Sequence, residues 1–156
     1  LLMSNYNISI NLNYPIERVF KVFIDLNKKE MPKFNDKNPT EVSYKKVIKQ
    51  VGKQKIEMET SITGYEKNKL YEVTNSISND KYISKYEFKE INSNSTEILL
   101  SETQEMMGFT SSLTLLFQKF NAKKKLKSKM EGIKEVLEEE LERRDGRNNN
   151  SKNEIE

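Results

Sequence analysis

The chain has 156 residues, which is long enough for one domain with a substantial hydrophobic core. A third of the residues are charged, but 27 basic and 24 acidic side chains leave a net charge of only +3, which is too small to indicate a nucleic-acid partner. Cysteine and histidine are both missing, which excludes disulfides, thiol nucleophiles, Ser-His triads and the usual zinc sites, so we expect no metal or other cofactor.

The N-terminal part predicts one strand followed by helical structure. Apolar residues alternate with Asn and Ser near residues 6–12, and the apolar positions are Tyr6, Ile8, Ile10 and Leu12. Pro15 suits the first position of a helix, and apolar residues at helical spacing continue to about Asp25. A second, shorter helix is predicted over residues 27–34, interrupted by Pro32, before a polar loop that reaches Thr40.

The middle of the chain predicts a meander of strands. Between Glu41 and Met106 short polar breaks separate pieces rich in β-branched and aromatic residues. We predict five strands near residues 42–50, 54–65, 70–78, 82–91 and 96–106. Apolar and polar residues alternate within them, which indicates that one face of the sheet is buried and the other is in water.

The last long element is predicted to be a helix over residues 108–144, ended by Gly146. One apolar stripe comprises Leu113, Leu116, Phe117 and Phe120, and a second, rotated stripe comprises Leu126, Met130, Ile133, Leu137 and Leu141. The helix therefore bends between the two stripes, or only its first half packs on the domain and the second half meets a partner or solvent. Residues 145–156 are polar and are predicted to form a flexible tail.

Together these elements predict an α+β fold in a single domain over residues 5–144. The antiparallel sheet of about six strands has one hydrophobic face, and the long C-terminal helix has a matching stripe. Both are buried most simply if the sheet curves around that helix. The first strand must join the sheet edge beside the last strands, because its backbone groups would otherwise lack partners.

A short N-terminal motif resembles a known superfamily. Residues 10–20 combine a strand, Pro15 and the pair Val19-Phe20, and Asp25, Pro32 and Phe34 match positions that follow. This pattern resembles the START-like, Bet v 1-like helix-grip (SRPBCC) superfamily, which includes polyketide cyclases and lipid-transport proteins, and favours an uncharacterised bacterial branch. The resemblance implies a cavity between sheet and C-terminal helix for a lipid-like or polycyclic ligand. The chain has no tryptophan, however, and lacks the polar constellations of the superfamily's known enzymes.

The candidate ligand-binding residues follow from strand parity and from the first helical stripe. They are Met58, Ile62, Tyr71, Tyr86, Leu100, Glu102, Gln104 and Phe117. Glu102 and Gln104 continue the face on which Ile98 and Leu100 lie, so we predict that they form the polar end of the cavity. The alternatives are that the aromatic and apolar positions are plain core, and that the two polar residues reach water at an open end or are turned by a bulge.

Three functions remain open at this point. The first is non-catalytic binding of an apolar or amphipathic small molecule in the cavity. The second is a protein–protein interaction module with a filled core, as in co-chaperone domains of this fold. The third is a cyclase-like enzyme, for which a single carboxylate such as Glu102 is a weak signal.

Location and surface contacts are predicted from the same patterns. No apolar run approaches the roughly 20 residues of a membrane span, and a bacterial cytoplasmic protein is expected. The segment 123–129, from Lys123 to Lys129, is the densest basic patch. It is either a solvated helix face or a weak contact for an anionic membrane surface, and the glutamates that follow it offset long-range attraction.

Overall fold

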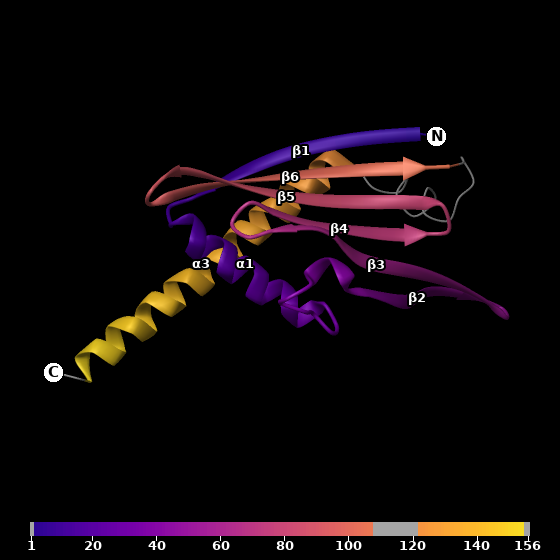
Figure 1. The fold of residues 1–156 in the computed structure, drawn as a ribbon. Helices are drawn as coiled ribbons and strands as arrows, with labels where there is room; N and C mark the ends of the chain where they lie inside the picture. Colours follow the sequence, from indigo (N-terminus) through magenta and orange to yellow (C-terminus); the bar gives the residue numbers. More distant parts are fainter. Residues whose placement is uncertain (1, 108–121, 155–156) are drawn as a thin grey trace.

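The computed structural model describes residues 2–107 and 122–154 and confirms the α+β fold class, with a six-stranded antiparallel sheet in the order β1-β6-β5-β4-β3-β2 (Figure 1). The elements in chain order are β1 (Leu2–Leu12), α1 (Ile16–Glu30), the short 3-10 helix η1 (Pro39–Glu41), β2 (Ser43–Val51), β3 (Gln54–Glu66), β4 (Leu70–Ile77), β5 (Asp80–Asn92), β6 (Ser95–Met106) and α3 (Ala122–Asn153). The five predicted central strands are therefore present, with bounds shifted by at most two residues.

The first strand takes the edge position that the sequence predicts. It pairs with β6 in an unbroken antiparallel ladder that runs from Leu2 opposite Met106 to Leu12 opposite Thr96. In this register Ile8 and Ile10 lie beside Leu100 and Ile98, so the apolar residues of both strands share one face. That face forms the core, because both long helices pack on it.

One helix, not two, follows the first strand. Helix α1 continues without interruption through residues 27–30, and Met31 after it is extended, with φ −105° and ψ 100°. The predicted second helix over residues 27–34 is therefore wrong. Because a residue that precedes proline is disfavoured in the helical region, Pro32 ends α1 at this point and does not interrupt a new helix.

The core is built on aromatic rings between α1 and the sheet. Phe23 of α1 lies 4.9 Å from Tyr86, 5.1 Å from Phe88 and 5.5 Å from Tyr71, measured between ring centroids. Phe20, one turn earlier, contacts Phe88 edge to face at 5.0 Å. These geometries are the favoured ones for aromatic pairs, so α1 is fixed against β4 and β5 by ring packing.

Helix α3 lies along β1 and beside α1, and its C-terminal end projects beyond the sheet (Figure 1). The predicted second stripe is confirmed, because Leu126, Met130, Leu137 and Leu141 are buried within this chain and Ile133 is half-buried. The predicted helix end near Arg144 is wrong, since α3 runs through Gly146 to Asn153 and includes residues 145–153 of the segment predicted as a tail. The stripe that contains Phe117 lies outside the described residues, as does Asn121 at the start of the segment 121–125 where the bend is predicted.

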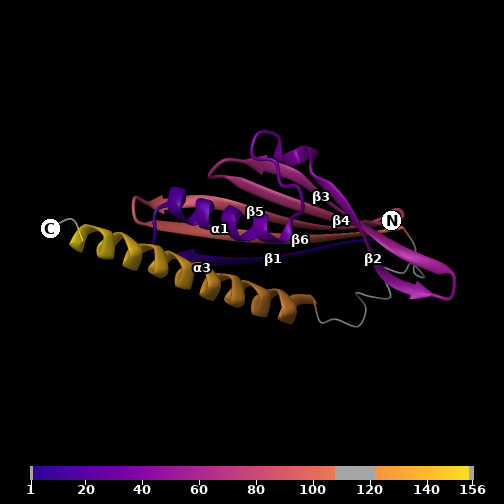
Figure 2. The same cartoon turned by 90° about the horizontal axis from the view of Figure 1, so that it is seen from below.

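The sheet extends past the helices at its other end. Figure 2 shows the β2–β3 hairpin reaching away from α1 and α3, on the side opposite the C-terminus. A small apolar cluster there contains the buried Ile77 and Met106, with Ile48, Ile56, Met58 and Tyr82 packed against it. Strand β2 is the open edge of the sheet, and its Val47 and Val51 are exposed.

Candidate ligand-binding site

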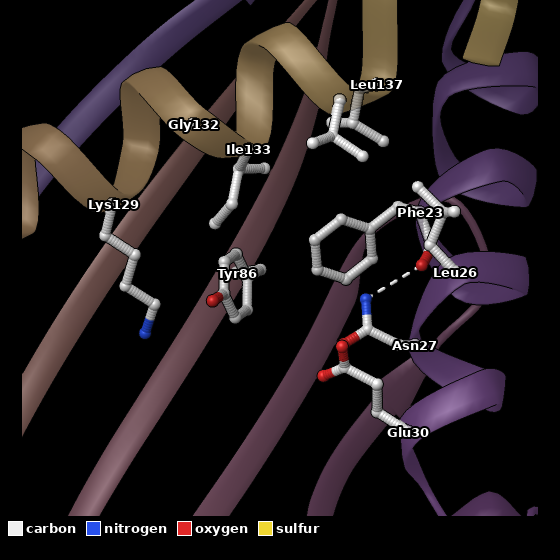
Figure 3. A pocket seen from close by; sticks show the side chains of 10 residues that line it. Phe23, Leu26, Asn27, Glu30, Tyr86, Lys129, Gly132, Ile133 and Leu137 are labelled. Atoms are coloured by element: carbon white, nitrogen blue, oxygen red, sulfur yellow. Dashed lines mark hydrogen bonds between the residues drawn. The ribbon is translucent and has the colours of Figure 1, made fainter. Parts of the chain in front are cut away.

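A pocket with a volume of about 440 Å³ lies between α1, β5 and α3 (Figure 3). Its walls are Phe23, Leu26, Asn27 and Glu30 from α1, Tyr86 from β5, and Lys129, Gly132, Ile133, Val136 and Leu137 from α3. Most of this lining is hydrocarbon, with the polar groups on a few side chains.

Helical spacing explains why these residues face one another. The lining positions in α1 and in α3 recur three or four residues apart, so each set lies on one face of its helix. Gly132 contributes no side chain to the α3 wall, and a Cβ atom added there would meet nothing within 4 Å. The glycine therefore leaves open space in the middle of the pocket.

The α1 wall carries two polar side chains near the end of the helix. The Asn27 Nδ2 donates a hydrogen bond to the Phe23 backbone oxygen at 2.8 Å, which fixes the amide against the helix. Glu30, one turn later, is exposed to solvent, and Figure 3 shows it across the pocket from Lys129. The carboxylate of Glu30 makes no ion pair with any described residue.

The α3 wall carries one cation, held by a buried acid. Lys129 Nζ donates to Glu102 Oε1 at 2.6 Å, with 6% of the Glu102 side chain exposed and 43% of the Lys129 side chain. The same ammonium lies 6.0 Å from the centre of the Tyr86 ring. Burial of the ammonium opposes its charge, but the Tyr86 phenol and the Glu102 carboxylate outweigh that cost and raise the pKa of Lys129 above its ordinary value.

The structure separates the predicted site residues. Glu102 faces inward as its strand parity predicts, although the cavity is bordered by its partner Lys129 and not by Glu102 itself. Among the predicted residues that the structure describes, Tyr86 alone lines this cavity. Of the other described positions, Ile62, Tyr71 and Leu100 lie in the buried core. Met58 packs in the small apolar cluster with Ile77 and Met106, and Gln104 is half-buried on β6. Phe117 lies outside the described residues.

The helix residues of the pocket were not among the predicted ligand-binding residues. Phe23 and Leu26 belong to the apolar face of α1, and Ile133 and Leu137 belong to the second stripe of α3. Those patterns predict only that the residues are buried. Gly132 is the one feature of the α3 sequence that differs from a core pattern, because a glycine leaves space on the face that the apolar residues share.

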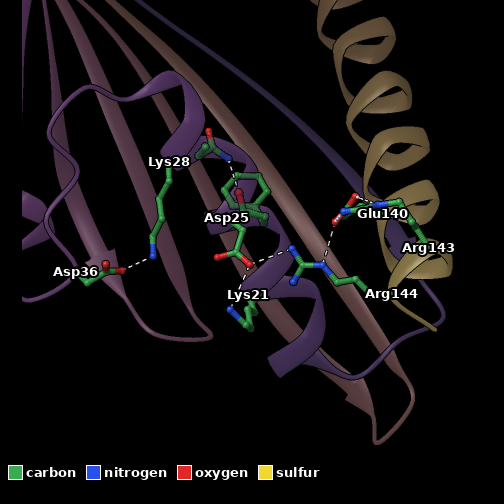
Figure 4. A network of polar contacts seen from close by, with 9 residues as sticks. Lys21, Asp25, Lys28, Asp36, Glu140, Arg143 and Arg144 are labelled. Atoms are coloured by element: carbon green, nitrogen blue, oxygen red, sulfur yellow. Dashed lines mark hydrogen bonds and ion pairs between the residues drawn. The ribbon is translucent and has the colours of Figure 1, made fainter. Parts of the chain in front are cut away.

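Ion pairs connect α1 to α3 beyond the pocket (Figure 4). Arg144 donates to Asp25 at 3.0 Å and to Glu140 at 3.1 Å, and Arg18 pairs with Asp145.

Burial opposes ionisation of Asp25, but its hydrogen bonds from Arg144 and Lys21 lower its pKa overall. Hydrogen bonds from Arg143 and Arg144 lower the pKa of Glu140 to about 2. We call Asp25, Glu140 and Arg144 the helix clamp.

A second hollow of about 370 Å³ lies on the opposite side of α1, between that helix and the β3–β4 turn. Its lining includes both basic and acidic side chains, and two of these, Lys28 and Asp36, form an ion pair (Figure 4). Within residues 2–107 and 122–154, no cluster of three acidic side chains is placed to hold a metal ion. Neither long helix, over its described residues, is long and apolar enough to cross a membrane.

Known proteins provide a family and a fold for comparison. A family model described as "Domain of unknown function (DUF3284)" matches residues 6–123, whereas no curated protein is similar enough to match. The chain is similar to SA2116, a protein of unknown function from Staphylococcus aureus, with a TM-score of 0.57 and 14% identity over 92% of this chain and 98% of that one. It is also similar to Ara h 8.0201, with a TM-score of 0.52 and 14% identity over 89% of this chain and 97% of that one. These likenesses support the helix-grip, Bet v 1-like fold and nothing beyond the fold.

Proposed function

The chain belongs to the DUF3284 family, and we propose that it binds an apolar or amphipathic small molecule, without converting it, in the cavity between α1, β5 and α3. The cavity itself carries this proposal. Its volume of about 440 Å³ lies in the range of small-molecule sites, and its lining combines a hydrocarbon surface with a few polar groups.

The burial of α3 favours a small ligand over a protein partner. A protein-binding helix would keep its second apolar stripe exposed, but Leu126, Met130, Leu137 and Leu141 are each at most 4% exposed. Only Val136 among the apolar residues of described α3 is strongly exposed, at 50%, and it borders the cavity. The fold alone would not decide the function, because one fold hosts many functions.

Two glycines of the same helix allow a matched test. Gly132 lines the cavity, and Gly146 lies further along α3 with open space around it. We expect Gly132→Leu to fill the cavity and Gly146→Leu to leave it open. Both changes add the same side chain to the same helix, so their general effects on helix stability are comparable.

The measurement is a fluorescence titration with N-phenylnaphthylamine, an uncharged apolar probe. The wild-type protein should bind one probe per chain, and Gly132→Leu should weaken binding by at least about tenfold, a loss of about 1.4 kcal/mol. The affinity of Gly146→Leu should match that of the wild type. Equal affinities of the two variants, or no saturable binding to the wild type, would overturn the proposed function.

A further inference from the structure

Lys129 is the one cation among the described side chains that line the cavity. Its stem crosses the α3 wall, and its ammonium lies on the same side of the pocket as the Tyr86 hydroxyl (Figure 3). An ammonium has three N–H donors, and the hydrogen bond to Glu102 uses one of them. Lys129 lines the pocket and 43% of its side chain stays exposed, so a bound molecule can reach this residue.

The position of Glu102 requires an explanation that packing does not provide. Its neighbours on the same face of β6, Ile98 and Leu100, are fully buried, and Glu102 itself is 5% exposed. An apolar residue would fit there, and a buried carboxylate is costly unless it is paired. The pair does, however, hold the flexible four-carbon stem of Lys129 in one place, which a lysine alone would not do.

The other charge at the pocket is less constrained. Glu30 lies near the end of α1, is exposed to solvent and has no ion-pair partner among the described residues. Water therefore screens its carboxylate strongly, whereas Lys129 is held against a buried acid and an aromatic ring. Of the two charged side chains that line the cavity, Lys129 is thus held in place more firmly than Glu30.

Resting on the function proposed above, we infer that the ligand is an amphiphile with an anionic oxygen headgroup, such as a carboxylate, that binds to Lys129 Nζ. Its hydrocarbon part lies along Phe23, Leu26, Ile133 and Leu137. Glu102 is a positioning residue, which holds the ammonium at the cavity wall and does not contact the ligand.

Three ligands with the same alkyl chain separate the headgroup from the chain. Decanoate, decanol and decylamine are titrated by isothermal calorimetry into the wild-type protein. Decanoate should bind about tenfold more tightly than decanol, which is the factor expected for one charge-assisted hydrogen bond. Decylamine should bind more weakly than decanol, because its head repeats the charge of Lys129.

The double variant Glu102→Leu/Lys129→Met removes the charge without leaving a buried acid unpaired. We expect the ratio of decanoate to decanol affinity to fall to about one in this variant, because the charge-assisted bond is lost. The control is Lys127→Met, which removes a lysine from an exposed position of the same helix and should keep the wild-type ratio. The single variant Glu102→Leu should also lower the ratio, since the Lys129 stem is no longer held.

The outcomes distinguish this inference from the proposed function. If none of the three alkyl ligands and no N-phenylnaphthylamine binds, both fail. If decanol binds as tightly as decanoate, or if the double variant keeps the preference for decanoate, the headgroup inference fails and the apolar site stands. If decylamine binds most tightly of the three and Glu30→Gln abolishes that binding, the headgroup of the ligand is cationic and binds to Glu30, and the inference is wrong. A higher ratio in Glu102→Leu would show that Glu102 competes with the ligand, which would overturn its positioning role.

Discussion

At the scale of single residues, Glu102 and Lys129 differ in how much each depends on the other. Glu102 is buried, so its carboxylate has few other donors within reach. Lys129 is partly exposed, so without Glu102 its ammonium can turn toward water. Removal of the lysine therefore leaves a buried charge unpaired, whereas removal of the acid does not.

This asymmetry predicts unequal stability losses. We expect Lys129→Met to lower the free energy of unfolding by about 2 kcal/mol, below the 3–5 kcal/mol typical of fully buried pairs because one partner is partly exposed. Glu102→Leu should cost less than about 1 kcal/mol, and the double variant should recover most of the loss caused by Lys129→Met. Urea denaturation measures all three. Equal losses in the two single variants would contradict the asymmetry.

Phe23 has two roles, since it packs on Tyr71, Tyr86 and Phe88 and also borders the cavity. We expect Phe23→Ala to lower the free energy of unfolding by about 3–5 kcal/mol, as for other buried phenylalanines. Ile91→Ala is the control, because Ile91 is 49% exposed and should cost less than about 0.5 kcal/mol. A small loss for Phe23→Ala in thermal denaturation would mean that the ring contacts do not stabilise α1.

At the scale of elements, the helix clamp makes the attachment of α3 depend on pH. The pKa of Asp25, which accepts from Arg144 across the two helices, is lowered. The pKa of Glu140, which pairs with Arg143 and Arg144 within α3 and so holds Arg144 in place, is lowered from its ordinary value of 4.5 to about 2. Both carboxylates therefore stabilise the folded state above their unfolded pKa values. That stabilisation is lost as the pH falls from 4.5 to about 2. The urea midpoint of the wild type should thus fall toward that of Asp25→Asn/Glu140→Gln across this window. If the difference in urea midpoint between the wild type and the double variant stays constant with pH, the helix clamp does not stabilise the folded state.

The sequence predicted the sheet better than the helices. Period-two alternation located the five central strands and the inward orientation of Glu102, because side-chain direction in a strand depends on position parity alone. Where α3 passes the predicted end, Arg144 and Asp145 pair with Asp25 and Arg18 of α1, which are more than a hundred positions away in the sequence. A local pattern such as Gly146 near the helix end contains no information on contacts between residues so far apart in the sequence.

The candidate site was predicted only in part, for a related reason. Parity shows which face a strand residue occupies, but not where along the strand a helix covers it. Ile62 and Leu100 were predicted at the cavity wall, yet they lie in the packed core, and Tyr86 on the neighbouring β5 borders the open space. The walls come from two helices, and in a helix the spacing that lines a pocket is the same spacing that fills a core.

At the scale of the whole molecule, the sheet has an open edge at β2 that must be kept from pairing with other chains. Lys45, Lys46 and Lys49 lie on this strand, and a bulge interrupts its pairing with β3 between Val47 and Lys49. Charged side chains and bulges are both known to prevent edge-to-edge association. Val47 and Val51 on the same strand are exposed, so the edge also carries apolar side chains.

Neutral residues at this edge should therefore promote self-association. We expect Lys46→Thr/Lys49→Thr to form larger species than the wild type at equal concentration, as detected by sedimentation velocity. Lys89→Thr/Lys127→Thr removes the same charge from β5 and α3, away from that edge, and should sediment like the wild type. If both double variants associate equally, net charge and not the edge keeps the chains apart.

The ladder between β1 and β6 has a consequence for how the chain folds. Strands β2 to β6 are joined in sequence by short turns, whereas the paired residues of β1 and β6 are more than eighty positions apart. Contacts of such long range close a large loop and form slowly, so the meander should assemble first and the N-terminal strand should dock last. Pulsed hydrogen exchange during refolding should protect the amides of β4 and β5 before those of β1. Simultaneous protection would mean that β1 already pairs with β6 when the meander forms.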